Sequence, residues 1–364
     1  MNHSAQHAGH IRIRYALQRG AFGLDVDAKL AMRGITGIFG PSGAGKTTLL
    51  RCIAGLERPQ SGVLAVEDSV WQDSDNGIDL PPHKRDIGYV FQEPRLFSHL
   101  NVRHNLEYGL KRNKSRPSFE FDQIIDLLGL AGLLDRQPER LSGGEAQRVG
   151  IGRALLRSPR FILMDEPVAA LDAARKDEVL PFIERLHASL DVPVLYVSHN
   201  IDEICLLCDQ LLVMDAGESL AHGDLQSVLT QTDLPVLAGD EAGSVIQATS
   251  ASYDSEYGLS EVAVSAGSLW VPGKYDPAAI LRLRLRANDV SLCRERATQS
   301  SILNTLSATI ERIQQESEYS VLVHLRAGSD RLISRVTRRS AAELNLVPDE
   351  KIIMQIKSVS VRHA

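Results

Sequence analysis

Residues 40–47, with the sequence Gly-Pro-Ser-Gly-Ala-Gly-Lys-Thr, constrain the fold of this chain more than any other segment. They follow a short apolar run at 35–39 and precede a run with helical spacing that includes Leu49, Leu50 and Ile53. A glycine-rich turn between a strand and a helix can present backbone N–H groups to a phosphate at the helix N-terminus. The sequence therefore predicts a P-loop within an α/β domain.

This loop is expected to hold a nucleotide and Mg²⁺. Lys46 is expected to neutralise the β- and γ-phosphates, and the Thr47 hydroxyl is expected to ligate Mg²⁺. The glycines permit backbone torsions and a close approach to phosphate that a Cβ atom would block. The residues expected to contact the nucleotide are Gly40, Pro41, Ser42, Gly43, Ala44, Gly45, Lys46, Thr47 and Thr48.

Two later apolar runs, at 161–164 and 194–198, end in polar residues. Such runs suit strands buried on both faces of a parallel sheet, whose carboxyl ends face the ligand crevice. We expect Asp165 to hold Mg²⁺ through water, Glu166 to be the base that orients the attacking water, and His199 to contact the γ-phosphate. An acidic pair after a strand can also be a solvated turn, but the histidine that ends the next run favours catalysis.

With these motifs in this order, the chain resembles the ATP-binding subunits of ABC transporters. Gln92 matches the Q-loop of that family, Leu-Ser-Gly-Gly-Glu at 141–145 its signature, and Ala-Leu-Asp at 170–172 its D-loop. Ala169 is a departure, because the family often has Ser there. The resemblance covers about residues 11–232 and implies a P-loop ABC ATPase domain with a helical subdomain, in which Gln92 acts in catalysis and as a Mg²⁺ ligand.

The resemblance also implies a homodimer with two ATP molecules between its subunits. Ser142, Gly143 and Gly144 of one subunit would meet the γ-phosphate held by Lys46 of the other. This is physically sound if residues 142–144 begin a helix, because exposed N–H groups and the helix dipole favour an anion. Hydrolysis would then remove ATP from the interface and open the dimer.

An aromatic residue near the N-terminus stacks on adenine in most relatives. Phe22 and Tyr15 are both candidates, with ordinary core packing as the alternative for each. We prefer Phe22.

Charge is unevenly distributed along the chain. Residues 1–250 contain 25 Lys and Arg against 33 Asp and Glu, a net charge of −8, and residues 251–364 contain 15 against 13, a net charge of +2. An acidic ATPase half argues against binding to nucleic acid, which favours a basic face. No run approaches the ~18 apolar residues needed to cross a bilayer. We therefore expect no nucleic-acid partner and contact with a membrane only through other subunits; the resemblance implies a peripheral location at the cytoplasmic face of the inner membrane.

The segment after Gln92 resembles the region of bacterial importer subunits that receives a helix of the membrane permease. Leu96, Phe97 and Leu100 could line a groove for such a helix. The alternative is that they belong to the core of the helical subdomain.

The last third of the chain has a different pattern. Glycine, serine and small polar residues dominate from 236 to about 267, which predicts a linker. Runs at 280–286, 321–326 and 352–357 alternate with period two and predict a small all-β, barrel-like domain. The predicted divisions are 1–235 for the ATP-binding domain, 236–297 for a linker and first β segment, and 298–364 for the final domain.

Residues 300–361 resemble a Mop domain, an OB-like oxyanion-binding module of molybdate proteins. The resemblance implies a pocket of hydroxyl, amide and ammonium groups that is suited to MoO₄²⁻. Its departures are Leu303, where relatives often carry Arg, and Ser307, where a basic residue is common. Edge-strand and turn positions without a ligand are the alternative. The residues that match the pocket are Ser301, Asn304, Lys357 and Ser358.

Together, the two resemblances imply an ATP- and Mg²⁺-dependent subunit that energises molybdate import, with tungstate as a second cargo. Its partners would be a second copy, permease subunits and, indirectly, a periplasmic molybdate-binding protein. Importers of sulfate or sugar share residues 1–232 in outline and are the first alternative. A soluble ABC ATPase acting on nucleic acid is opposed by the acidic first half, and a molybdate sensor would not need Glu166 or His199.

Overall fold

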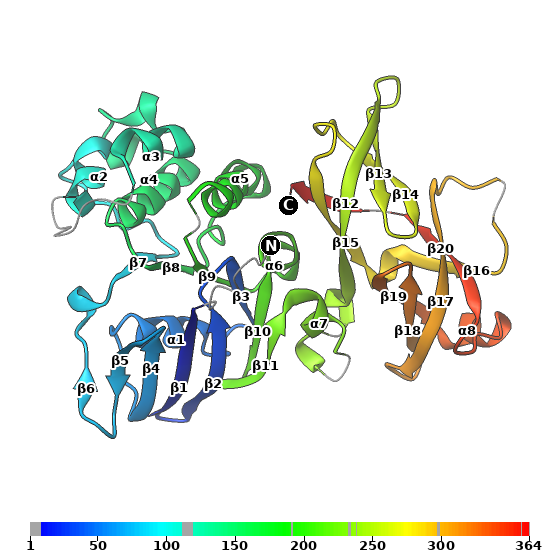
Figure 1. Ribbon diagram of the computed structural model, residues 1–364, viewed down its shortest axis with the longest axis horizontal. Coiled ribbons are helices and arrows are strands. Elements are labelled where there is room, and N and C mark those ends of the chain that lie inside the picture. The colour runs from blue at the N-terminus through cyan, green and yellow to red at the C-terminus, as the bar shows by residue number, and fades with distance from the viewer. Residues whose placement is uncertain are drawn as a thin grey trace, which may run out of the picture. The chain divides into compact units, whose positions relative to one another are not determined.

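The computed structural model describes residues 9–110, 119–190, 192–231, 234–237, 239–296, 299–357 and 359–363. Contacts divide the chain into two compact units, Met1–Asp224 and Leu225–Ala364 (Figure 1). The sequence places this division at residue 235 instead. It falls earlier because helix α7 (Leu225–Leu229) packs on strand β12 (Gly243–Asp254) of the second unit.

A single large sheet forms the centre of the first unit. Its strands are β1 (His10–Arg19), β2 (Phe22–Ala31), β3 (Ile35–Phe39), β4 (Ser61–Val66), β5 (Ser69–Asp73), β6 (Ile78–Asp79), β7 (Ile87–Val90), β8 (Phe161–Asp165), β9 (Val194–Ser198), β10 (Gln210–Asp215) and β11 (Glu218–Asp224). Their order in the sheet is β6-β5-β4-β1-β2-β11-β10-β3-β9-β8-β7. The five strands from β10 to β7 in this order pair in parallel, and those from β6 to β2 pair antiparallel. Between them, β11 pairs antiparallel with β10 and in parallel with β2.

The parallel strands bring the predicted motifs together. Strands β3, β8 and β9 are buried at every residue, as their continuous apolar runs predict. Because the carboxyl ends of parallel strands lie at one edge of a sheet, the P-loop after β3, Asp165 at the end of β8 and His199 after β9 share that edge.

Six α-helices lie among the described residues of the first unit. They are α1 (Lys46–Ile53), α2 (Val102–Leu110), α3 (Phe121–Leu128), α4 (Gly143–Leu155), α5 (Ala173–Leu190) and α6 (Ile201–Leu207). Helices α2, α3 and α5 all pack on α4, which confirms the predicted helical subdomain (Figure 1). Gly152 permits this packing, since a Cβ atom there would lie 2.9 Å from Leu106 and 3.1 Å from Leu128. Within the described part of the chain, we find no helix with the length and apolar character to span a bilayer.

Two five-stranded sheets form the second unit and confirm its predicted all-β character. The first has the order β14-β13-β12-β15-β21 and the second β16-β20-β17-β18-β19. Both sheets contribute to one hydrophobic core, which extends in sequence from Ile246 to Ile356. The remaining elements are β13 (Leu259–Val264), β14 (Gly267–Pro272), β15 (Ile280–Arg286), β16 (Val290–Cys293), β17 (Asn304–Gln315), β18 (Ser320–Ala327), β19 (Asp330–Thr337), α8 (Arg338–Glu343), β20 (Lys351–Ile356) and β21 (Ser360–His363).

The prediction of a linker up to residue 267 is wrong. The segment contains the long strand β12, which pairs with β13 and β15, and its Ile246 and Ala248 enter the core. Composition misled the prediction because small residues are needed here for packing. A Cβ atom at Gly243 would lie 2.3 Å from the guanidinium of Arg284, so this glycine makes room for a fully buried arginine.

Candidate functional site

A cavity of about 310 Å³ opens at the P-loop between β3 and α1. Gly43 and Gly45 have φ values of 87° and 92°, in the left-handed region that side chains disfavour. A Cβ atom at Gly45 would also lie 2.9 Å from Phe22. The loop therefore requires glycine at these two positions. The cavity is lined by Phe22, Ser42, Gly43, Gly45, Lys46, Thr47, Thr48 and Glu166.

Lys46 is the first residue of α1 and supplies a positive charge to this cavity. The side chain is buried, and its ammonium donates hydrogen bonds to the carbonyl oxygens of Gly40 at 2.7 Å and Pro41 at 2.9 Å. Burial lowers the pKa of Lys46, while the nearby Glu166 and Asp165 carboxylates oppose that shift. An anion in the cavity would therefore face both a cation and a helix N-terminus.

Asp165 and Thr47 meet although 118 residues separate them in sequence. The Thr47 hydroxyl donates to Oδ1 of Asp165 at 2.8 Å, and the Tyr89 hydroxyl donates to Oδ2 at 3.1 Å. Asp165 is only 7% exposed, and its burial raises the pKa of the carboxyl group while the two hydrogen bonds lower it. A carboxylate beside a hydroxyl is a hard-oxygen donor set that fits Mg²⁺.

Glu166 lies beside His199 at the same edge. Nδ1 of His199 is 3.1 Å from Oε2 of Glu166, and the Glu166 amide donates to the Val197 carbonyl at 3.1 Å. Glu166 has a φ of 47°, which a non-glycine residue adopts only where its surroundings hold it. The structure thus brings together the acid expected to be the base and the histidine expected to contact the γ-phosphate, with Glu166 on the cavity wall.

Gln92 lies on an exposed segment just after β7. Parallel pairing sets Val90 of β7 opposite Met164 of β8, so Gln92 is at the same edge as Asp165. Within the described residues, no hydrogen bond joins Gln92 to Asp165 or Thr47. The structure therefore places Gln92 near the site without a contact that fixes its side chain.

The signature segment begins helix α4, as predicted. Ser142 is the N-cap residue, and its hydroxyl accepts a hydrogen bond from the Glu145 amide at 3.2 Å. In return, Oε2 of Glu145 accepts from the Ser142 amide at 2.7 Å, which completes a capping box. Ser142, Gly143 and Gly144 are not among the residues lining the P-loop cavity of the same chain.

The structure distinguishes the two aromatic candidates by position. Phe22 lines the P-loop cavity beside Gly45. Tyr15 is fully buried, and its hydroxyl lies 3.2 Å from the side-chain oxygen of Gln72 and 3.4 Å from the Cys52 carbonyl. Of the two, only Phe22 therefore lies at the cavity.

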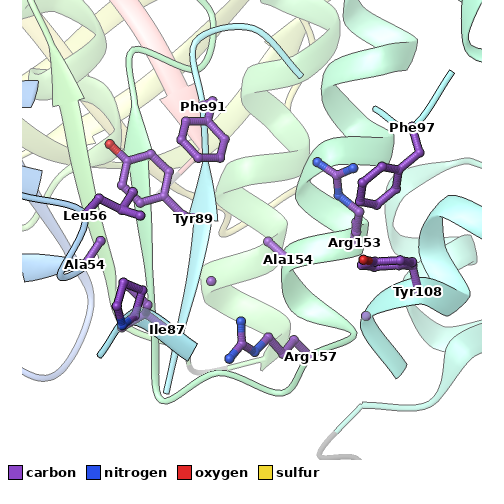
Figure 2. Close-up of a pocket in the computed structure, with 13 residues that line it drawn as sticks. Ala54, Leu56, Ile87, Tyr89, Phe91, Phe97, Tyr108, Arg153, Ala154 and Arg157 are labelled. Atoms are coloured by element: carbon purple, nitrogen blue, oxygen red, sulfur yellow. The ribbon is translucent and has the colours of Figure 1, made fainter. Parts of the chain in front are cut away.

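A second cavity, of about 280 Å³, lies near the segment that follows Gln92 (Figure 2). Of the three apolar residues that the sequence singles out there, Phe97 lines it, whereas Leu96 and Leu100 do not. The Arg153 guanidinium stacks over the Phe97 ring at 5.0 Å. The walls are mainly apolar and are formed by Ala54, Leu56, Pro82, Ile87, Gly88, Tyr89, Phe91, Phe97, Tyr108, Gly109, Arg153, Ala154 and Arg157.

In the second unit, strand register brings Asn304 opposite Ile356, the neighbour of Lys357. The Asn304 side chain is already engaged, because its oxygen accepts from the Trp270 amide at 2.6 Å and its nitrogen donates to the Trp270 carbonyl at 3.0 Å. Ser301 and Lys357 are exposed, and Ser358 lies outside the described residues. Leu303, the first of the two departures, is 64% exposed.

Tyr89 is a partner of Asp165 that the motifs of the sequence do not predict. In the sequence, Tyr89 stands only three residues before Gln92, and no motif connects it with Asp165. The parallel pairing of β7 with β8, in which Tyr89 lies opposite Leu163, is the signal that could have found it.

Comparison with protein families matches two segments of the chain. Residues 24–169 match the model described as ABC transporter, and residues 300–362 match the TOBE domain. The first match contains the P-loop, the signature and Asp165, and the second contains the predicted oxyanion residues.

Several curated proteins are similar to the chain over nearly its whole length. Molybdenum import ATP-binding protein ModC 1 of Azotobacter vinelandii is 47% identical over 97% of this chain and 99% of its own length. Its counterpart in Thiobacillus denitrificans is 49% identical over 96% and 97%, respectively. Among solved structures, CbiO1 from Clostridium perfringens, part of an ABC transporter complex, is 26% identical with a TM-score of 0.52, covering 62% of this chain and 93% of that one.

Proposed function

Because the chain belongs to the ModC family of ABC transporter ATP-binding proteins, we infer that it is the ATP-hydrolysing subunit of a molybdate importer. The observation that supports ATP hydrolysis is the convergence of Lys46, Thr47, Asp165 and Glu166 on the P-loop cavity. The near full-length similarity to molybdenum import proteins supports the cargo.

Five residues in and around the cavity divide the work of hydrolysis. Lys46 neutralises charge on the β- and γ-phosphates, as the N-terminus of α1 does with its N–H groups. Thr47 and Asp165 would hold Mg²⁺, with Gln92 as a further ligand, and the bound ion would supply positive charge at the transferred phosphoryl group. Glu166 orients the attacking water and accepts its proton.

His199 and Phe22 position groups around this chemistry. The contact of 3.1 Å between His199 Nδ1 and Glu166 Oε2 holds the base in one orientation. The other nitrogen of the His199 ring then contacts the γ-phosphate. The half-buried Phe22 offers its ring to adenine at the cavity wall.

A homodimer supplies the signature residues that each cavity lacks. The capping box fixes the N-terminus of α4, where the first amides have no partner within the helix. Ser142, Gly143 and Gly144 of one subunit contact the γ-phosphate bound by Lys46 of the other. ATP therefore closes the dimer, and its hydrolysis opens it.

The apolar cavity beside Phe97 receives a helix of the permease. A cavity walled by Phe91, Phe97, Tyr108 and the stem of Arg153 is suited to the apolar face of such a helix (Figure 2). The protein is then held at the cytoplasmic face of the inner membrane through this partner. A periplasmic molybdate-binding protein acts on it only indirectly, through the permease.

The second unit binds molybdate at the paired ends of β17 and β20. Lys357 provides the positive charge there, and the hydroxyls of Ser301 and Ser358 provide donors. Asn304 fixes β17 to Trp270 of β14 and so positions the end of the strand.

ATPase activity of the reconstituted transporter tests the cargo. Binding protein loaded with molybdate or tungstate should stimulate ATP hydrolysis, and the same experiment with the sulfate-loaded protein of a sulfate importer should not. Stimulation by sulfate or a sugar alone would assign the chain to one of the alternative importers.

A further inference from the structure

Tyr89 of β7 lines the apolar cavity and also contacts a carboxylate beside the P-loop. Its hydroxyl donates a hydrogen bond to Asp165 beside the P-loop, and its ring lines the apolar cavity. Figure 2 shows the ring beside Leu56, on the wall opposite Phe97 and Tyr108, with the hydroxyl directed away from those two residues. One side chain therefore connects the place proposed for a permease helix with the place proposed for Mg²⁺.

The connection is short and stiff. A tyrosine ring has only two side-chain torsions, so a displacement of the ring also displaces its hydroxyl. Tyr89 packs against Phe91, with 4.3 Å between the ring centroids, and Phe91 lines the same cavity. Because a hydrogen bond weakens steeply when its angle or length departs from the favoured range, a small shift of the ring changes the contact with Asp165.

Asp165 is sensitive to such a change because two hydroxyls hold it. Thr47 of α1 contacts Oδ1 and Tyr89 of β7 contacts Oδ2, so each oxygen is fixed from a different element. A buried carboxylate that loses one of its donors is free to turn toward another partner.

We propose that Tyr89 is a positioning residue through which occupancy of the apolar cavity sets the orientation of Asp165. The inference rests on the proposed function, in which Asp165 holds Mg²⁺ and a permease helix enters the cavity. Tyr89 does not touch nucleotide in this scheme. It makes the affinity of the ATP site for a divalent ion depend on whether the permease is docked.

The substitution Tyr89→Phe tests this proposal, since it keeps the ring and removes only the hydroxyl. We expect the affinity for Mn²⁺ in the presence of a non-hydrolysable ATP analogue, followed by electron paramagnetic resonance, to fall about tenfold, as for the loss of a hydrogen bond to a charged group. In the reconstituted transporter, the ratio of kcat with loaded binding protein to basal kcat should fall toward one. The KM for ATP should change little, because Lys46 and the P-loop are intact.

Tyr196→Phe is the matched control. Tyr196 is a buried tyrosine of β9 in the same sheet, and its hydroxyl donates to a carboxylate outside the ATP site, Glu203, at 3.2 Å. A purely structural role for Tyr89 predicts that the two variants differ from wild type only in Tm. If Tyr89→Phe keeps both the Mn²⁺ affinity and the stimulation seen in Tyr196→Phe, the proposal is wrong.

Two further variants keep the result interpretable. Asp165→Asn should abolish Mn²⁺ binding, and if Mn²⁺ still binds, the proposed function fails. If Mn²⁺ binding is lost in Asp165→Asn but kept in Tyr89→Phe, only the proposed role of Tyr89 fails. Leu56→Ala leaves the Tyr89 hydroxyl in place but removes the side chain beside its ring in Figure 2. Leu56→Ala should lower the stimulation of ATP hydrolysis by the loaded binding protein, although the Tyr89 hydroxyl is unchanged. Unaltered stimulation would contradict the proposed role of Tyr89, even if Tyr89→Phe did not fold.

Discussion

The two units of this protein each carry a predicted anion site, but they hold the predicted residues in different ways. In the first unit, Lys46 and Asp165 are buried; carbonyls of the P-loop itself hold Lys46, and the distant Thr47 side chain holds Asp165. In the second, Lys357 and Ser301 are exposed, and the amide of Asn304 is taken up by Trp270. Burial with fixed partners marks a site built for a ligand, whereas exposed polar residues at strand ends need an independent test.

The largest effect is expected at Glu166. Glu166→Gln removes the base but keeps the size of the side chain, so ATP should still bind while kcat falls at least about a hundredfold. The bound nucleotide should then trap a closed dimer that gel filtration can detect. Lys46→Ala should instead abolish binding of ATP, measured by calorimetry.

Glu218→Gln is a suitable control, because Glu218 is an exposed carboxylate of the same unit. Hydrolysis at a near wild-type rate by Glu166→Gln would show that another group acts as the base. The roles of the site residues would then be no better predicted in the first unit than in the second.

The next effect concerns the dimer, and mixed dimers measure it. Ser142→Arg in one chain and Lys46→Ala in the other damage the same ATP site if each site takes one motif from each subunit. The second site is intact, so up to about half of the activity should remain. With both substitutions in one chain and a wild-type partner, both sites are damaged and activity should be lost. Equal ATPase rates in the two arrangements would exclude the composite site.

The contrast between the units also explains what the sequence could predict. The P-loop was located with its strand and helix because glycine torsions and helix termini determine its geometry locally. The contact of Asp165 with Tyr89 was missed because it depends on strand register, which the sequence did not supply. Similarly, the choice of Phe22 over Tyr15 needed the position of each ring relative to the cavity.

Prediction failed most in the second unit, where composition was the main signal. The small residues of β12 predicted a linker, but they lie in a strand whose Gly243 accommodates the buried Arg284. Asn304 matches an oxyanion ligand by resemblance, and its contacts with Trp270 became visible only in the structure. A polar residue in a strand can serve a ligand or the backbone, and the sequence does not distinguish the two.

Molybdate binding to the second unit is expected to show a smaller effect. Calorimetry on the full chain should use the Lys46→Ala background. This substitution prevents molybdate, a tetrahedral anion, from giving a heat signal by binding at the P-loop. Lys357→Ala should weaken binding about tenfold, because it removes the cation mapped to the site. Lys351, also exposed and on β20, provides the matched control Lys351→Ala. The absence of heat with millimolar molybdate in the Lys46→Ala background would show that the second unit has no such site.

The smallest effect concerns His324, a buried titratable group of the second unit. Its Nε2 is 3.5 Å from the Arg312 guanidinium across the β17–β18 pair. Burial, followed by the charge of Arg312, lowers the pKa of His324 to about 4, and the Glu311 carboxylate only partly opposes this shift. Below pH ~6.5 the unfolded chain therefore takes up a proton that the folded chain does not.

Stability of the second unit should consequently fall as the pH is lowered from about 6.5 toward 4. We expect a decrease on the order of 1–2 kcal/mol in the free energy of unfolding between pH 7.5 and 5.0. The chain has two tryptophans, so Trp71→Phe leaves Trp270 of β14 to report urea unfolding of this unit by fluorescence. In the same background, His324→Gln should flatten this pH dependence because glutamine does not titrate. If the slope with pH is unchanged in His324→Gln, a group other than His324 dominates the pH dependence of this unit.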